Sequence, residues 1–118
     1  MVIDVHRDSI LKSTGELVRP VTEVNGDAAA QLMFVVGGSD SSVYWQQNLA
    51  LALNLRQTLN EKYNDICRPP YLKTSNYNQD LVPYSILIEA GSSGNSLEEV
   101  TVSAKLFAES LSEYFKKI

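Results

Sequence analysis

The chain has 118 residues, of which 44% are hydrophobic and 20% are charged, an ordinary composition for one soluble globular domain. Fourteen Asp and Glu residues against ten Lys and Arg give a net charge of −4, which argues against nucleic acid as a partner. The longest apolar runs are far shorter than a bilayer span, and no signal sequence precedes the first strand-like residues. We therefore expect one soluble domain without a membrane segment.

Hydrophobic patterning predicts a mixed order of strands and helices, and hence an α/β fold. A first strand is expected at about Val2 to His6. A hairpin should follow, with arms from Leu17 to Val24 and from about Ala30 to Val36, because Asn25-Gly26-Asp27 is a strong turn signal. We expect this hairpin to lie beside the first strand.

Two helices are predicted, each from a one-sided apolar stripe. The first should run from about Val43 to Asn64, with Trp45 anchoring it in the core. Pro69-Pro70 prevents any continuation, since proline lacks the amide proton that a helix needs. The last helix should begin after Ser96, whose spacing to Glu99 is that of a capping box.

Two further extended segments are predicted between these helices, a short one at Tyr71 to Thr74 and an apolar strand from Tyr84. The apolar strand carries one carboxylate, Glu89, to its C-terminal end, where a Gly-rich turn begins. Open α/β enzymes place their chemistry at such strand ends. A carboxylate in an apolar setting costs free energy unless it is paired, bound to metal or used in catalysis. The only histidine, His6, also ends a strand-like run, so these two residues suggest part of a metal-hydrolase site.

Each candidate also has a purely structural interpretation. His6 could serve only as a hydrogen-bonding residue, and Glu89 could lie near the amides that begin the last helix. Asp8 could orient His6 or cap the turn that follows it. The single cysteine, Cys67, has no Cys or His neighbour at metal-ligand spacing, so we expect a small buried apolar residue there.

A second enzyme class is suggested by the loop Gly37-Gly38-Ser39-Asp40-Ser41, which follows a strand and precedes a helix. Its Gly-Gly-x-Asp-Ser core resembles the pyrophosphate-binding loop of ATP pyrophosphatases, where backbone amides hold phosphate at a helix N-terminus. So short a pattern is weak evidence, and it leaves Glu89 unexplained. An ATP pyrophosphatase-like nucleotide binder is therefore the lesser alternative.

Five sequence blocks in a fixed order carry a more specific family resemblance. They are Asp4-Val-His6-Arg-Asp8-Ser9, Val35-Val-Gly37, Trp45-Gln-Gln-Asn48-Leu49-Ala50, Tyr77-Asn78-Gln79, and Leu87-Ile-Glu89-Ala-Gly91 with Asn95-Ser-Leu-Glu98-Glu99. In that order they resemble the C-terminal part of the stage II sporulation protein P family, which is related to the zinc N-acetylmuramoyl-L-alanine amidases. The resemblance spans nearly the whole chain.

The resemblance implies a zinc-dependent peptidoglycan hydrolase of sporulation engulfment, with a phosphorylase/hydrolase-like mixed sheet flanked by helices. It maps His6 to a zinc ligand and Glu89 to the catalytic acid/base. Such a glutamate takes a proton from the attacking water and passes it to the departing amine. The bond implied is the amide between the lactyl group of N-acetylmuramic acid and L-alanine, or a peptide cross-link. Tyr77, Asn78 and Gln79 are our candidates for contact with stem peptide or glycan.

The family's first two zinc ligands, a histidine and a glutamate, lie upstream of the strand that begins this chain. We therefore expect residues 1–118 to be the C-terminal portion of a zinc amidase catalytic domain, an incomplete domain that alone binds zinc weakly or not at all and has little activity. The alternative is a non-catalytic fragment that binds peptidoglycan or a partner.

The resemblance also implies a location and partners. The full-length protein would be extracytoplasmic and membrane-associated. It would work with a lytic transglycosylase of sporulation and an integral membrane protein. Exposed strand edges would in addition allow a homodimer.

Overall fold

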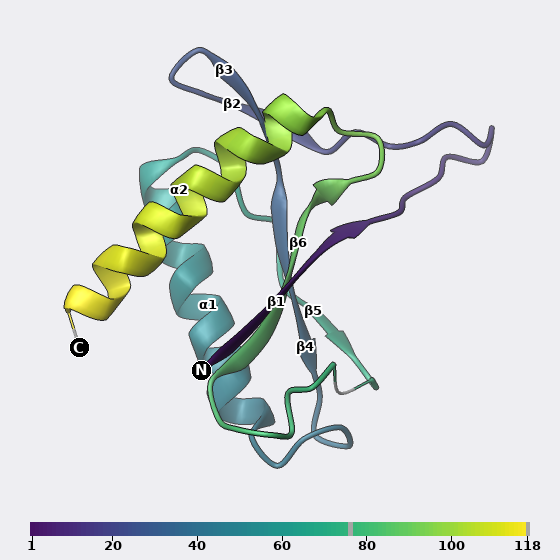
Figure 1. Ribbon diagram of the computed structural model, residues 1–118. Coiled ribbons are helices and arrows are strands. Elements are labelled where there is room, and N and C mark those ends of the chain that lie inside the picture. The colour runs from purple at the N-terminus through teal and green to yellow at the C-terminus, as the bar shows by residue number, and fades with distance from the viewer. Residues whose placement is uncertain (76, 118) are drawn as a thin grey trace.

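The computed structural model describes residues 1–75 and 77–117. These residues form an α/β domain built on a mixed four-stranded sheet in the order β1-β6-β4-β5 (Figure 1). The strands of this sheet are β1 (Val2–Asp8), β4 (Leu32–Gly37), β5 (Tyr71–Lys73) and β6 (Ser85–Ser92). The pairs β1·β6 and β4·β5 are parallel, whereas β4·β6 is antiparallel. The predicted mixed α/β class is confirmed.

The hairpin predicted at Asn25-Gly26 exists, but its placement was predicted wrongly. Strands β2 (Val21–Val24) and β3 (Asp27–Ala30) pair with each other in a separate two-stranded ribbon, and β1 pairs with β6 instead. The returning arm ends at Ala30, after which β4 enters the main sheet as a new strand. The strand order follows from how much of each strand is buried. β4 is apolar along nearly its whole length and needs neighbours on both sides, while the largely exposed β1 suits an edge.

One face of the sheet carries the hydrophobic core and both described helices, α1 (Trp45–Lys62) and α2 (Leu97–Lys116) (Figure 1). Alternate strand residues such as Phe34 and Ile88 point to this face, and the rings of Phe34 and Phe107 lie 6.0 Å apart. Cys67 is buried in this core as predicted, and burial raises the pKa of its thiol to about 12.

The limits of α1 and the start of α2 agree with the sequence prediction to within two residues, but the anchor of α1 differs. Its fully buried side chains include Leu51, Leu55 and Leu59, whereas Trp45 is only partly buried and lies outside the core cluster. The prediction that Trp45 anchors the helix in the core is therefore wrong, because the leucines of the following turns fill the core instead. Neither described helix is long and apolar enough to cross a membrane.

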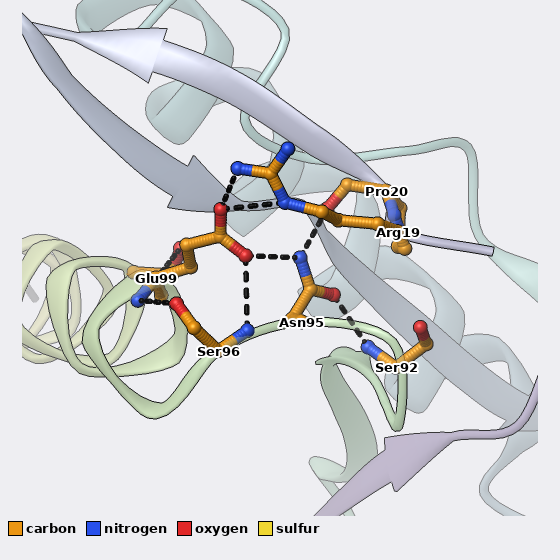
Figure 2. Close-up of polar contacts among 7 residues, drawn as sticks. Arg19, Pro20, Ser92, Asn95, Ser96 and Glu99 are labelled. Carbon is orange, nitrogen blue, oxygen red and sulfur yellow. Dashed lines mark hydrogen bonds and ion pairs between the residues drawn. The ribbon is translucent and has the colours of Figure 1, made fainter. Parts of the chain in front are cut away.

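The start of α2 is held by the predicted capping box and by a contact to a distant loop (Figure 2). Ser96 Oγ accepts a hydrogen bond from the Glu99 amide at 3.2 Å, and Glu99 Oε1 accepts one from the Ser96 amide at 3.0 Å. Arg19 donates from Nε to Glu99 Oε2 at 2.7 Å, while Asn95 Nδ2 donates to the Pro20 carbonyl at 3.0 Å. We call this set, Arg19, Pro20, Asn95, Ser96 and Glu99, the α2 anchor.

The Gly-rich turn before α2 is explained by close packing. Gly91 has a φ of +68°, and a Cβ there would lie 2.5 Å from Asn95 Oδ1. A Cβ on Gly94 would lie 2.4 Å from the Val18 carbonyl oxygen. Only glycine fits at either position, so these residues allow the turn to dock against the β1–β2 connection.

Candidate active site

The opposite face of the sheet, which we call the open face, carries the sequence-predicted site residues. It is formed by the side chains that alternate with the core residues, and neither described helix packs on it. Its polar and aromatic residues come from β1, β5 and β6. They are Asp4, His6, Tyr71, Lys73 and Glu89.

His6 and Glu89 lie on adjacent strands as direct neighbours. β1 and β6 run parallel, and His6 is the register partner of Glu89. Register partners in a parallel pair project to the same face of the sheet, so the two side chains share the open face. His6 Nε2 lies 3.1 Å from Asp4 Oδ1, two residues back on the same strand. The tertiary structure thus brings together the two residues that the sequence singled out.

Glu89 is a carboxylate with an unmet hydrogen-bonding capacity. Its Oε2 atom is buried and has no hydrogen-bond partner among the described residues. Burial, and then the charge of Asp8, raise the pKa of Glu89 above its usual value, although His6, Lys73 and Arg68 oppose the rise. A half-buried acid with a raised pKa holds its proton to a higher pH than an ordinary glutamate, which favours a role in proton exchange.

The structural interpretation of Glu89 as a helix-start residue does not hold. The carboxylate that caps α2 belongs to Glu99, whereas Glu89 points to the face of the sheet opposite the helices. Glu89 instead lines a groove of about 300 Å³ on the open face. The other residues that line it are Asp8, Ile10, Met33, Arg68, Tyr71 and Lys73.

Asp8 caps the turn that follows β1. Its Oδ1 accepts a hydrogen bond from the Ser9 amide at 2.8 Å, and its Oδ2 lies 3.6 Å from Arg68 Nη2. The carboxylate near the imidazole of His6 is that of Asp4. Of the two roles considered for Asp8, the structure therefore supports capping.

Gln79 of the Tyr-Asn-Gln block is buried and holds its loop against the sheet. Its Oε1 accepts from the Gly37 amide and its Nε2 donates to the Val35 carbonyl, both at 2.9 Å. Its own carbonyl accepts from Ser42 Oγ at 2.8 Å and from Asn48 Nδ2 at 3.2 Å. With an exposed fraction of 1%, Gln79 positions the loop and does not face solvent.

The other two residues of that block lie closer to the surface. Tyr77 is half-buried with a φ of +50°, and the Lys73 ammonium lies 6.0 Å from its ring centroid. Asn78 is exposed, with a φ of +63°. Of the three residues predicted to contact substrate, only Tyr77 and Asn78 are therefore open to solvent.

The Gly-Gly-x-Asp-Ser loop is tied to its neighbours within the fold. The Gly38 amide donates to the Lys73 carbonyl at 2.9 Å, and Ser41 Oγ donates to the carbonyl of Thr74. Helix α1 begins only at Trp45, after a separate turn. The loop thus closes the end of β4 against β5 and does not lead directly into the helix.

Comparison with known proteins decides the family. The family model described as Stage II sporulation protein P (SpoIIP) matches residues 1–112. The chain belongs to the stage II sporulation protein P family. It is 30% identical over 119 residues to stage II sporulation protein P of Bacillus subtilis (strain 168). That match covers 97% of this chain and 28% of the relative, and no solved structure matches.

These findings confirm the resemblance carried by the five sequence blocks. The chain spans less than a third of its stage II sporulation protein P relative, in agreement with the expected likeness to the C-terminal part. Membership in the family associates the chain with sporulation.

The zinc site implied by the family resemblance is not complete within the described residues. Over residues 1–75 and 77–117, no group of three or more His, Cys, Asp or Glu side chains is arranged to hold a metal ion. A catalytic zinc usually has three protein ligands and an open position. His6 and the neighbouring Asp4 do not make such a set on their own.

Three residues of the groove were not identified as functional from the sequence. Arg68 appeared only as part of the Pro-Pro helix stop, and Tyr71 and Lys73 only as a short extended segment. One signal could have found Tyr71 and Lys73, because they are two residues apart on a short strand and so project to the same face. Their convergence on Glu89 depends on the pairing of β5 with β4, which no local pattern encodes.

Proposed function

We propose that this chain is the C-terminal portion of the catalytic domain of a peptidoglycan hydrolase of the N-acetylmuramoyl-L-alanine amidase class, acting in sporulation engulfment. In this proposal Glu89 is the acid/base and His6 is one ligand of a zinc ion. The observation that carries it is the register pairing of His6 with Glu89 on the open face. Glu89 lines the groove there, and one of its carboxylate oxygens is buried without a hydrogen-bond partner among the described residues.

The chemistry assigned to this chain is proton transfer by Glu89. As the carboxylate, Glu89 takes a proton from the water that attacks the amide carbonyl, and it then delivers that proton to the departing amine of alanine. A raised pKa aids both steps, because it brings the basic and acidic forms closer in population at neutral pH. Since the described residues lack a full donor set, the remaining zinc ligands would come from the part of the longer family proteins outside this match.

The aromatic and basic lining of the groove also supports a second candidate, a domain that binds peptidoglycan without cleaving it. Lys73 lies 5.2 Å from the ring centroid of Tyr71, and both face the same groove as Glu89. Aromatic rings and ammonium groups bind sugars and peptides without any chemistry. Sedimentation of the 118-residue chain with purified sacculi tests this candidate, and binding without release of stem peptides supports it.

Partners are proposals of the same kind. A lytic transglycosylase of sporulation and an integral membrane protein would act with the full-length protein. Strand β1 lies at one edge of the sheet, and its Val5 is 66% exposed, so this edge could pair with a second copy of the chain.

The decisive experiment joins the N-terminal part of the Bacillus subtilis relative to the front of this chain and measures zinc content and stem-peptide release from sacculi. Glu89→Gln should lower the rate about 100-fold to 10,000-fold with zinc content unchanged. His6→Ala should lower the zinc content itself.

Glu98→Gln is the matched control, because Glu98 is an exposed carboxylate at the start of α2, away from the groove. It should leave both release and zinc content unchanged. Normal release by Glu89→Gln, or absence of release by the unaltered fusion, would contradict the proposed hydrolase.

A further inference from the structure

We propose that Arg68 and Lys73 form a subsite for a carboxylate group of an acidic peptide, beside Glu89 on the open face. This inference rests on the proposed function and adds to it a class of substrate and two residues that recognise it. It starts from the charge of the groove, where two cationic side chains from different segments line the same space.

The guanidinium of Arg68 is not fully hydrogen-bonded within the described structure. Its Nε and Nη2 atoms are buried without a hydrogen-bond partner among the described residues. Arg68 forms an ion pair with Asp8, whose Oδ2 lies 3.6 Å from Nη2, beyond normal hydrogen-bond length, and Glu89 lines the same groove. A guanidinium has five N–H donors in a planar fork that fits a carboxylate with two parallel hydrogen bonds. Buried donors without acceptors are costly, so their retention points to an acceptor supplied by a ligand.

The backbone at Arg68 is rigid, which favours a binding role. The Arg68 amide donates to the Leu32 carbonyl at 2.7 Å, and the Arg68 carbonyl accepts from Arg56 Nε at 3.2 Å. Pro69-Pro70 follow directly and restrict the chain further. The Arg68 side chain, which lines the groove, therefore extends from a backbone segment that is held in place.

Lys73 supplies the second positive charge. It lies on the edge strand β5, in register with Gly37, and its ammonium contacts the ring faces of Tyr71 and Tyr77. Among the described residues no carboxylate forms an ion pair with Lys73. The aromatic rings orient the ammonium without neutralising it, so its charge remains available to an anion.

The position of the two cations defines what the ligand must look like. They line the groove that also holds the unpartnered oxygen of Glu89, so a bound peptide would place one carboxylate at Arg68 and Lys73 while an amide bond lies near Glu89. Arg binds a carboxylate in preference to a neutral amide because the charged hydrogen bonds are shorter and stronger. An acidic residue close to the scissile bond is the feature that this subsite would select.

A binding experiment on the 118-residue chain tests the subsite without any need for hydrolysis. The probes are N-acetyl-Ala-Glu-amide and its neutral isostere N-acetyl-Ala-Gln-amide, titrated into isotope-labelled protein and followed by amide chemical shifts. We expect the acidic peptide to bind about 10-fold to 100-fold more tightly, with shifts centred on Arg68 and Lys73. Equal binding of the two peptides, or equally tight binding of inorganic phosphate, would overturn the proposal.

Three variants separate recognition from general charge and from folding. Arg68→Gln should remove the preference for the acidic peptide, and Arg68→Lys should restore only part of it because lysine lacks the fork. Arg7→Gln is the matched control, since Arg7 lies at a groove on the opposite face of the sheet. A loss of preference in Arg7→Gln equal to that in Arg68→Gln would contradict the subsite. Amide spectra of the free variants report whether each is folded.

Kinetics of the fusion protein on sacculi separate this inference from the proposed hydrolase. If the fusion releases stem peptides, Arg68→Gln should raise KM about 10-fold with a smaller effect on kcat. An unchanged KM would overturn the subsite and leave the hydrolase standing. If the fusion releases nothing while the acidic peptide still binds selectively, the hydrolase fails and the carboxylate site stands.

Discussion

Two glutamates on opposite faces of the sheet have opposite surroundings. Glu99 in the α2 anchor receives hydrogen bonds from Arg19, Asn95 and Ser96, and these lower its pKa to about 2 although burial opposes them. Glu89 on the open face has an oxygen with no donor among the described residues, and its pKa is raised. A carboxylate with every donor in place stabilises the fold. One left without donors lowers stability and is available for chemistry.

The same contrast holds for the two faces as a whole. The helix-covered face buries the core side chains, and its buried Asn48 has both a hydrogen-bond donor and an acceptor as partners. On the open face, two nitrogens of Arg68 and one oxygen of Glu89 have no hydrogen-bond partner among the described residues. Variants on the first face should therefore change stability, and variants on the second should change binding or activity.

The largest effect should come from Phe34→Ala on the helix-covered face. Phe34 is fully buried and packs against Phe107, so its removal should cost about 3–5 kcal/mol of unfolding free energy. Urea denaturation measures this loss. Met33→Ala, at the neighbouring and half-buried position on the open face, is the control and should cost well under half as much. Similar losses for the two would remove the distinction between the faces.

Asn48→Ala should have the next largest effect. The Asn48 side chain is fully buried, donates to the Gln79 carbonyl and accepts from the Ser85 amide at 2.8 Å. Removing it leaves the Ser85 amide without this acceptor, while the Gln79 carbonyl keeps its hydrogen bond from Ser42 Oγ, so the loss should be about 1–3 kcal/mol. The exposed Asn54→Ala on the same helix should be nearly neutral. A neutral Asn48→Ala would mean that this network does not hold the loop.

The α2 anchor should make stability fall in acid. The folded pKa of Glu99 is about 2, below its ordinary value of 4.5, so its stabilisation is complete above about pH 4.5 and is lost as the pH falls towards 2. Glu99→Gln keeps a residue suited to the capping box but removes the charge that Arg19 pairs with. Thermal unfolding across this pH range should show a shallower dependence for the variant. An unchanged slope would mean that Glu99 is not the group responsible.

Glu89→Gln should cause the smallest change in unfolding free energy. The informative result is whether that change stabilises or destabilises the fold. A raised pKa means that the ionised form is disfavoured in the folded state, so stability decreases as the pH rises above the ordinary pKa of a glutamate. Replacement by a neutral amide should leave the unfolding free energy at pH 7 equal to or above that of the unaltered chain. A clear loss of stability would instead indicate that Glu89 is a structural residue.

Much of the local structure could be predicted from residues close together in the chain. The limits of both helices, the capping box at Ser96 and the turn at Asn25-Gly26 depend on hydrophobic period and backbone preference, which act over a few residues. The choice of His6 and Glu89 as site candidates depended on their rarity and apolar setting, and the family resemblance sharpened it. The hairpin was misplaced because period-two patterning does not say which strand becomes the neighbour.

The sequence by itself determined the elements of this protein, its family and the two residues at the centre of the candidate site. Only the tertiary structure decided that β1 pairs with β6 and that the buried Gln79 side chain bonds its loop to β4. It also decided that Arg68 and Lys73 line the same groove as Glu89. The physical reason is the separation along the chain over which each kind of interaction acts. Propensity and capping act between neighbours in the chain, whereas strand order and groove lining follow from how distant segments share a limited amount of buried space.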